Sequence, residues 1–433
     1  MVMNSERLAD QIGVYIHIPF CASRCSYCDF NTNSGMDDYI ETYIETLCKE
    51  MGSFFSTHKN READSDRKEV ISGAGSGDPI IPQPAIGTVF IGGGTPSYIG
   101  SEYIKKIIDK LYEKTGASLQ SVRQSGQRFE FTIEANPGTL TYEKLLSYSG
   151  LGINRLSLGL QSTQENLLKL LGRIHSFEDF TENIKTAKQI GFNNINADLI
   201  FGIPRQTMEN WVKTLAAVVK TGVTHLSCYS LSVEKGTKLS DMVESKMIPE
   251  PDEELDRQMY HYAVDYLRGM GYNQYEISNF ALPGYECRHN LKYWTCGEYI
   301  GFGAGAHSYL QGTRFSNETS VTDYIAKINE FGSAVVTSLS EKIGRDEQMK
   351  EYIILRLRLT AGFNVSGFEE EFGAGFFEIY GETVKKLEQN GLLEVRKTAN
   401  SECEQDSGWQ SNYNIRLTKK GMDFANIVFM EFI

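Results

Sequence analysis

Three cysteines near the start of the chain have a spacing that suits an iron–sulfur cluster. Cys21, Cys25 and Cys28 lie in the segment YIHIPFCASRCSYCDF, as Cys-x3-Cys-x2-Cys directly after a short apolar run. Three thiolates on one short loop can bind three irons of a cubane [4Fe–4S] cluster. The fourth iron then has no protein ligand and is open to a small molecule. The spacing therefore predicts a cluster that binds and reduces a substrate, rather than one that only carries electrons.

The alternative interpretation of these cysteines is a structural zinc site, or three unrelated thiols. A structural zinc ion usually takes four Cys or His ligands from two short motifs. A second Cys-x2-Cys or a His-x3-His occurs nowhere else in the sequence. The cluster is therefore favoured over zinc, both by the spacing and by the strand expected just before the loop.

Polar residues also recur close to the ends of other apolar segments. These residues are Gly93, Gly94 and Thr95 in the string GGGTP, then Glu134, Arg155, Gln161 and Asp198. A carboxylate, a guanidinium and an amide on one face suit a zwitterionic ligand with hydroxyl groups. For any one of them taken alone, ion pairing inside the protein, for example Glu134 with Arg155, is an equally good explanation, since buried charges are normally paired.

The elements that must position these residues alternate between strand and helix. Six short apolar segments are expected as strands, at residues 13–18, 88–91, 129–134, 154–160, 195–201 and 225–231. A candidate helix follows each of them, for example over residues 37–55, 177–190 and 207–221. This α/β alternation predicts a parallel sheet. Six units favour an incomplete (β/α)6 TIM-like barrel, although an open doubly wound sheet has the same periodicity. In a barrel the functional loops follow the carboxyl ends of the strands.

Two polar stretches and a change of pattern mark further parts of the chain. Residues 57–87 are predicted to be a surface insertion, and residues 397–412 another loop. From about residue 341, three helical runs and a hairpin-like strand pair predict a C-terminal α+β domain that resembles a winged helix. Residues 341–433 contain 12 Lys and Arg against 16 Asp and Glu. Because DNA-reading modules are usually basic, packing or partner docking is favoured over DNA binding.

Composition restricts the compartment and the partners. The chain has 433 residues, 41% of them hydrophobic, with a formal net charge of −13. This acidity argues against nucleic acid as a partner. An apolar run long enough to span a membrane and an apolar signal core are both missing from the sequence, so we expect a cytoplasmic protein. Eight cysteines in a chain of this length are not a disulfide framework, which also indicates a reducing compartment.

The cysteine loop, with Tyr27 before its last cysteine and GGGTP further on, resembles the radical S-adenosylmethionine (SAM) superfamily. The resemblance implies a [4Fe–4S] cluster held by Cys21, Cys25 and Cys28. It also implies that the open iron binds the amine and carboxylate of SAM, and that reduction of SAM gives a 5′-deoxyadenosyl radical. Such chemistry requires that the cluster contact the sulfonium and that water and oxygen be excluded.

Further strings resemble one group within that superfamily. YIHIPFC, IEANPGT, NRLSLGLQS, GRIHS and DLIFGIPRQT are similar to the group of coproporphyrinogen III dehydrogenase (HemN) and HemW, over about residues 13–310. The resemblance implies a radical SAM partial barrel over residues 1–235, an extension over 236–335 and a C-terminal domain over 336–433. The SAM site it implies contains Tyr15, Gly93, Gly94, Thr95, Glu134, Arg155, Gln161 and Asp198.

Two positions separate the members of this group. The dehydrogenase has a further cysteine two residues after its third cluster ligand, where this chain has Phe30. The chain also contains the HNxxYW motif of HemW proteins, which is associated with haem binding in that family; its residues here are His289, Asn290, Tyr293 and Trp294. A neutral imidazole is a good axial ligand for haem iron, and aromatic rings offer apolar surface to a porphyrin. The alternative is that His289 is hydrogen-bonded in a closing loop and Trp294 lies in the core.

The resemblance therefore implies a haem chaperone that binds haem, SAM and a [4Fe–4S] cluster and delivers haem to haem-accepting proteins. It implies an electron donor such as flavodoxin or ferredoxin, and it allows peripheral contact with a membrane. The second hypothesis is an oxygen-independent coproporphyrinogen III oxidase, which would decarboxylate two propionates through the radical. A third is a docking protein built on a decayed barrel, and the intact cysteine triad counts against it.

Overall fold

The helices and strands of this chain fall into two units. The computed structural model describes residues 11–64, 85–115, 129–332, 337–398 and 413–433. Unit 1 comprises Met1–Tyr260 and Glu298–Lys342, and unit 2 comprises His261–Gly297 and Ile343–Ile433. Each unit therefore combines two stretches that are separated in sequence, and the residues of the expected extension, 236–335, contribute to both. The three-part division at residues 235 and 335 stays a prediction.

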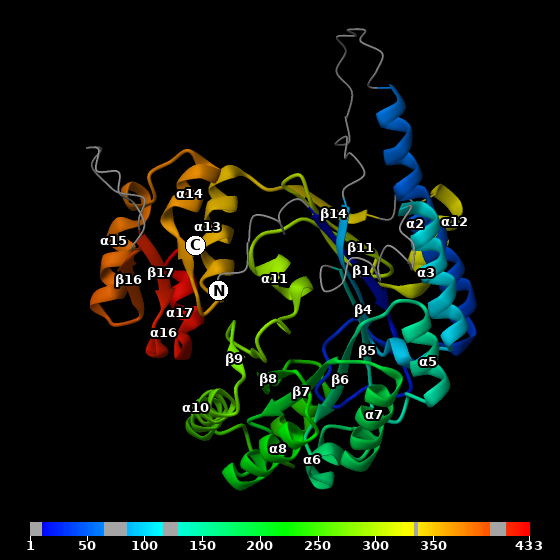
Figure 1. The fold of residues 1–433 in the computed structure, drawn as a ribbon, viewed down its shortest axis with the longest axis horizontal. Helices are drawn as coiled ribbons and strands as arrows, with labels where there is room; N and C mark the ends of the chain where they lie inside the picture. Colours follow the sequence, from blue (N-terminus) through cyan, green and yellow to red (C-terminus); the bar gives the residue numbers. More distant parts are fainter. Residues whose placement is uncertain (1–10, 65–84, 116–128, 333–336, 399–412) are drawn as a thin grey trace. The chain divides into compact units, whose positions relative to one another are not determined.

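Unit 1 is built on a large sheet whose central strands are parallel (Figure 1). In chain order these strands are β1 (Gln11–Ile18), β4 (Ala85–Gly93), β5 (Glu130–Ala135), β6 (Arg155–Gln161), β7 (Asn194–Phe201) and β8 (His225–Ser230). Each of the six predicted strands is present, and each pairs in parallel with the next. Within the described part of unit 1 the order does not return from β8 to β1, which confirms the incomplete barrel.

The sheet continues on the other side of β1 with strands from the second stretch of unit 1. These are β11 (Tyr299–Phe302), β12 (His307–Leu310), β13 (Thr313–Asn317) and β14 (Thr337–Lys342). Strand β11 is parallel to β1, and the remaining neighbours are antiparallel. The cysteine loop lies between two short parallel strands, β2 (Phe20–Cys21) and β3 (Asn33–Ser34), which hold its two ends together.

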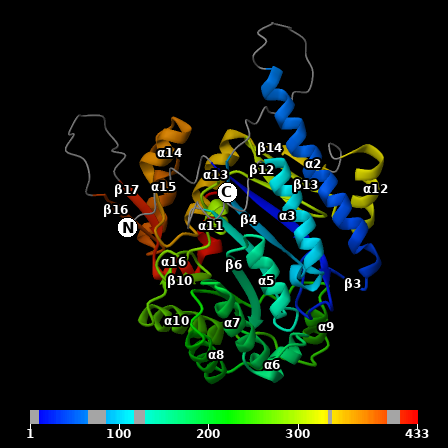
Figure 2. The same cartoon turned by 45° about the vertical axis from the view of Figure 1, so that its right-hand side comes forward.

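Helices cover the outer face of this sheet, as Figures 1 and 2 show for α2, α3, α5 and α7. The helices that begin in unit 1 are η1 (Asp37–Tyr39), α2 (Ile40–Asp64), η2 (Pro96–Tyr98), α3 (Ser101–Thr115), α5 (Tyr142–Gly150), α6 (Glu165–Leu170), α7 (Phe177–Ile190), α8 (Met208–Lys220), α9 (Lys238–Glu244), α10 (Glu253–Gly269) and α12 (Val321–Phe331). Strand β6 is buried along its whole length because helices cover it on one face and the barrel interior lies on the other.

Local sequence explains where these helices start and stop. Helix α7 begins with a capping box, in which Ser176 and Asp179 satisfy each other's backbone N–H groups, and it ends at Gly191 in the left-handed conformation. Helix α2 continues to Asp64, so the first residues of the predicted 57–87 insertion are helical rather than loop, and its last residues belong to β4. The rest of that predicted insertion, 65–84, lies outside the described residues.

Unit 2 contains the predicted C-terminal α+β domain. Its elements are β9 (Asn273–Gln274), β10 (Asn279–Ala281), α11 (Arg288–Trp294), α13 (Arg345–Arg356), β15 (Phe363–Asn364), α14 (Val365–Phe372), α15 (Phe376–Gln389), β16 (Leu393–Lys397), β17 (Tyr413–Leu417), α16 (Lys419–Asp423) and α17 (Ala425–Met430). The expected hairpin is the antiparallel pair β16–β17, to which β15 adds a third strand. Most of the loop predicted at 397–412 lies outside the described residues.

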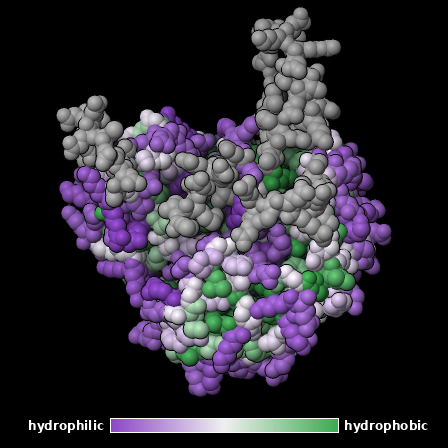
Figure 3. Space-filling model, viewed as in Figure 1, coloured by the Kyte–Doolittle hydropathy of each residue, from purple (hydrophilic) through white to green (hydrophobic). Residues whose placement is uncertain are grey.

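Aromatic side chains fill the core of unit 2. Phe368 packs edge-on against Tyr352 and Phe376, and all three are buried. Hydrophilic side chains dominate the visible surface over α15 (Figure 3).

Among the described residues of the whole chain, no helix has both the length and the hydrophobicity that a membrane crossing needs.

Candidate functional site

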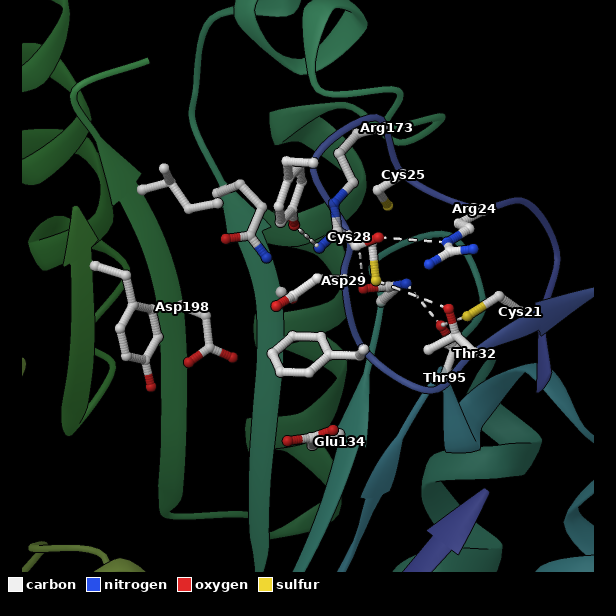
Figure 4. A pocket seen from close by; sticks show the side chains of 18 of the residues that line it. Cys21, Arg24, Cys25, Cys28, Asp29, Thr32, Thr95, Glu134, Arg173 and Asp198 are labelled. Carbon is white, nitrogen blue, oxygen red and sulfur yellow. Dashed lines mark hydrogen bonds between the residues drawn. The ribbon is translucent and has the colours of Figure 1, made fainter. Parts of the chain in front are cut away.

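A cavity of about 450 Å³ opens at the carboxyl ends of the parallel strands in unit 1. All three cysteines of the loop line it, together with Gly93, Gly94, Thr95, Glu134, Gln161 and Asp198. Figure 4 shows the cysteines around one end, while Glu134 and Asp198 project from their strands toward the other. Residues far apart in sequence, such as Cys21 and Asp198, therefore share one site, because parallel strands end at the same edge.

The GGGTP segment packs directly against the cysteine loop. Gly94 N–H donates to the carbonyl of Ile18 at 2.8 Å, and Thr95 N–H donates to that of Phe20 at 2.9 Å. Gly93 N–H donates to the Glu134 carboxylate at 3.1 Å. The N–H groups of Gly93, Gly94 and Thr95 are therefore already bonded, so the two glycines contribute space rather than free donors. A Cβ on Gly94 would lie 2.9 Å from the sulfur of Cys21.

The carboxyl groups of Glu134 and Asp198 lie close together at the end of the cavity away from the cysteines. Burial, together with the neighbouring charge of Asp198, raises the pKa of Glu134 to about 8, although the Gly93 N–H and Arg155 oppose this. Asp198 accepts hydrogen bonds from Ser157 Oγ at 3.1 Å and from Asn196 Nδ2 at 2.8 Å. A ligand that brings hydroxyl or ammonium donors would satisfy both carboxylates, because such donors favour their charged form.

Gln161 reaches the cavity through an unusual backbone conformation. Its φ is +68°, which non-glycine residues seldom adopt, and the β6–β7 pairing is irregular between Gly159 and Gln161. The side chain is buried and lines the cavity. A bulge re-aims a side chain at the end of a strand, and strain of this kind is concentrated at functional sites.

Tyr15 and Arg155 lie beside this cavity but do not line it. The Tyr15 hydroxyl is 2.9 Å from Nδ1 of His17, and burial followed by the charge of Glu134 raises its pKa. Arg155 is 2% exposed, and its charge lowers the pKa values of Glu134 and of the buried His225. Arg155 therefore contributes positive charge near Glu134.

The guanidinium of Arg173, which the sequence patterns did not single out, links residues on different sides of the site through hydrogen bonds. Arg173 donates to the hydroxyl of Tyr27 and to Oδ1 of Asn136, both at 2.7 Å. Asn136 in turn donates to Thr95 Oγ1 at 2.9 Å, which lies 3.4 Å from Cys21 Sγ. Arg173 and Asn136 lie within the strings GRIHS and IEANPGT, so the signal was present. Ser157, within the string NRLSLGLQS, and Tyr229 also line the cavity, and no sequence pattern pointed to Tyr229.

The same guanidinium affects the cysteines. Burial raises the pKa values of the Cys21 and Cys25 thiols, and the charge of Arg173 lowers both. Only thiolates bind iron, so this buried loop needs positive charge to hold three of them. Arg173 provides part of that charge, and irons would provide the rest.

The HNxxYW residues lie in unit 2, on helix α11. His289 is 1% exposed, and its Nε2 lies 2.8 Å from the Tyr293 hydroxyl, with the two rings edge to face. Asn290 is half-buried. The ring of Trp294 stacks under the guanidinium of Arg358, whose Cζ is 4.4 Å from the ring centroid. In this structure the histidine is thus buried and hydrogen-bonded.

Comparison with known proteins places the chain in a family. The family described as the Radical SAM superfamily matches residues 15–218, and the HemN C-terminal domain matches residues 343–399. The chain is 34% identical to the heme chaperone HemW of Bacillus subtilis, over 97% of this chain and 98% of that protein. It is 32% identical to the heme chaperone HemW of Lactococcus lactis, over 97% and 96%. The chain belongs to the HemW family.

A solved structure confirms the fold expected of this family. Coproporphyrinogen III oxidase (HemN) from Escherichia coli, described as a radical SAM enzyme, superposes with a TM-score of 0.77, covering 98% of this chain and 90% of that one. The two sequences are 20% identical, so the likeness establishes a shared fold. This member of the HemW family thus has the same fold as that enzyme.

Membership of the radical SAM superfamily implies a [4Fe–4S] cluster and SAM, and the residues present fit a cubane. Within the described part of the chain, no three Cys, His, Asp or Glu side chains lie close enough to share one metal ion. A cubane needs no such cluster of ligands, because each thiolate binds a different iron. The three thiols surround one end of one cavity, and Gly94 leaves space beside Cys21.

Proposed function

We propose that this chain is a heme chaperone, the name that its HemW relatives carry, and that it binds haem and transfers it to haem proteins. The observation that carries the proposal is full-length likeness: 34% identity over 97% of this chain to a heme chaperone. Phe30 supports it, because HemN-type enzymes have a further cysteine there by the resemblance described above. Phe30 lines the cavity and is 66% exposed.

Within this proposal, Cys21, Cys25 and Cys28 hold a [4Fe–4S] cluster, and SAM occupies the rest of the cavity. Bound there, the cluster would supply electrons to SAM, from an external donor such as flavodoxin or ferredoxin. The carboxylates of Glu134 and Asp198 would accept hydrogen bonds from the hydroxyl and ammonium groups of SAM. Tyr27, fixed by Arg173, would help to exclude water from the cluster end of the cavity.

His289 would bind haem iron in this proposal, with Asn290, Tyr293 and Trp294 around it. An iron at Nε2 would have to displace the Tyr293 hydroxyl, which lies 2.8 Å away. The deciding experiment is a haemin titration of the purified, anaerobically reconstituted protein, followed by the Soret band. We expect saturable uptake in the wild type, weaker uptake in His289→Ala, and undiminished uptake in Tyr293→Phe, which frees Nε2 and keeps the ring.

The same protein preparation also tests the second candidate function, an oxygen-independent coproporphyrinogen III oxidase, which the fold shared with HemN favours. Incubation with SAM, a reductant and coproporphyrinogen III should give no protoporphyrinogen IX if the chain is a chaperone. Product formation without haemin uptake would replace the chaperone proposal by the oxidase. Unchanged uptake in His289→Ala would remove only the assignment of that residue.

A further inference from the structure

Unit 2 contains a cavity of about 250 Å³ that is separate from the cluster site. It is lined by three polar residues, Arg358, Asp423 and Asn426, and by four apolar ones, Ile277, Phe424, Ala425 and Ile427. All of these residues belong to unit 2. The cavity therefore combines a guanidinium, a carboxylate and an amide with an apolar wall.

The guanidinium of Arg358 has unused hydrogen-bonding capacity. Its Nε is buried and has no hydrogen-bond partner among the described residues. Two carboxylates lie near this guanidinium: burial raises the pKa of Glu276 while the charge of Arg358 lowers it, and both carboxylates also have other partners. Asp423 pairs with His261 at 3.1 Å, and Glu276 accepts hydrogen bonds from the Asn279 amide and the Ser278 N–H. Because a buried donor without a partner is costly, this cation favours a ligand that brings an acceptor.

Trp294 holds this guanidinium in place. The stacked Trp294 ring, with its centroid 4.4 Å from Arg358 Cζ, restricts the guanidinium to one plane through cation–π attraction. A planar guanidinium presented in this way suits a carboxylate, which it can bind through two parallel N–H···O bonds. The last residue of the HNxxYW motif thus orients the guanidinium of Arg358.

The apolar wall continues beyond the cavity. Phe424 is 46% exposed and Ile427 is 56% exposed, and they are followed at the same spacing by Met430 and Ile433, at 68% and 61%. Phe424 directly precedes helix α17, and Ile427 and Met430 lie on it, each three residues after the one before, so these three neighbouring side chains form a short apolar strip. Ile433 lies beyond the end of the helix. A strip of exposed apolar side chains next to a cation fits a ligand with a flat apolar body and a carboxylate arm.

We propose that Arg358 binds a propionate carboxylate of haem while the edge of the porphyrin lies against Phe424 and Ile427. This inference rests on the proposed haem function, and it adds a binding residue that the HNxxYW motif does not include. The cavity is large enough for a propionate arm and part of one pyrrole ring, and the rest of the macrocycle lies along the apolar strip.

The test compares haemin with haemin dimethyl ester, whose propionates are esterified and carry no charge. Both are titrated into the full-length, reconstituted protein and followed by the Soret band. In Arg358→Gln, we expect the Kd for haemin to rise about tenfold or more, and the Kd for the ester to stay at the wild-type value. Arg358→Lys should retain part of the haemin affinity. Arg396→Gln, an exposed arginine elsewhere in unit 2, is the matched control and should change neither Kd.

A second variant tests the apolar wall without disturbing the core. Ile427 is exposed, so Ile427→Ser should fold normally and weaken the binding of haemin and of its ester alike.

Equal haemin affinity in Arg358→Gln and wild type would overturn the inference and leave the chaperone proposal standing. Equal losses for haemin and ester in Arg358→Gln would also overturn it, since the arginine would then be structural. If Ile427→Ser impaired binding to phosphatidylglycerol vesicles but not haemin uptake, the strip would be a lipid contact instead. No haemin uptake by the wild type would end both proposals.

Discussion

Gly94 shows how the absence of a side chain can serve a metal-binding loop. A Cβ at this position would lie 2.8 Å from the carbonyl oxygen of Phe20 and 2.9 Å from Cys21 Sγ. The first of these is a backbone atom, which cannot move without moving the cysteine loop. The backbone conformation of Gly94 is one that other residues can adopt, so its role is to leave space.

Gly94→Ala should therefore displace the loop and weaken cluster binding. We expect less iron and sulfide per chain after anaerobic reconstitution, and a loss of stability of about 1–3 kcal/mol, as for other overpacked sites. Gly150→Ala is the matched control, because a Cβ there meets no atom within 4 Å. Full iron content and unchanged unfolding in Gly94→Ala would show that the loop accommodates the methyl group.

Single residues differ in how far the sequence reveals them. Cys21, Cys25 and Cys28 lie within eight positions, so their spacing alone predicts that they share a site. Glu134 and Asp198 lie on strands with a recognisable pattern, and parallel pairing brings them to the same edge. Arg173 lies in a loop, and its bonds to Tyr27 and Asn136 depend on tertiary structure. The positive φ of Gln161 likewise has no signature in its residue type.

At the scale of elements, helix α2 is joined to the second stretch of unit 1 by one buried carboxylate. Glu50 accepts hydrogen bonds from the Tyr324 hydroxyl at 2.5 Å, from Asn317 Nδ2 at 2.6 Å and from Gly303 N–H at 2.9 Å. These donors come from α12, the end of β13 and the loop after β11. Periodicity predicts the helix and its apolar face, but it cannot predict that a glutamate on that face has three partners more than 250 residues away.

Glu50 should make the stability of unit 1 depend on pH. Burial raises its pKa to about 7, although its three hydrogen bonds oppose this. The folded state therefore binds the proton more tightly than the unfolded state does. This contribution is complete below the ordinary carboxyl pKa and is lost as pH rises through about 7. Between about pH 4.5 and 7 the loss amounts to about 3 kcal/mol.

Glu50→Gln should remove this dependence, because an amide does not titrate in this range. The measurement is the unfolding midpoint of reconstituted protein across that pH range, with Glu45→Gln on the exposed side of the same helix as the control. Glu134, whose pKa is also raised, contributes in the same direction to every variant, so the difference between curves isolates Glu50. Parallel curves for wild type and Glu50→Gln would contradict the assignment.

At the scale of the whole molecule, the chain leaves unit 2 and returns to it. Residues 261–297 and 343–433 form one unit, although the intervening residues belong to unit 1. Thr360 N–H donates to Tyr275 O at 3.1 Å, and Arg356 donates to Thr295 O at 2.9 Å. Ile277 and Cys296 pack against the C-terminal core. Strand and helix patterns alone do not reveal such a division, because it depends on which distant segments share a core.

This division predicts the result of removing residues 343–433. A chain that ends at Lys342 keeps the three cysteines and every residue that lines the cluster cavity. It loses the core on which residues 261–297 pack, including the partners of Gln274, Tyr275 and Thr295. We therefore expect cluster iron close to that of the full-length protein, rapid proteolysis between residues 261 and 297, and loss of haemin uptake.

Iron content serves as the internal control in that experiment, since it reports on unit 1 in the same sample. Loss of both iron and haemin would mean that unit 1 does not fold without the C-terminal segment. The two units would then not bind their cofactors independently of each other. If the truncated chain bound haemin as tightly as the full-length protein does, two proposals would be contradicted. One is that the HNxxYW residues of unit 2 bind haem, and the other is that Arg358 binds a propionate. Retained iron with lost uptake would separate the two cofactors along the same boundary that divides the fold.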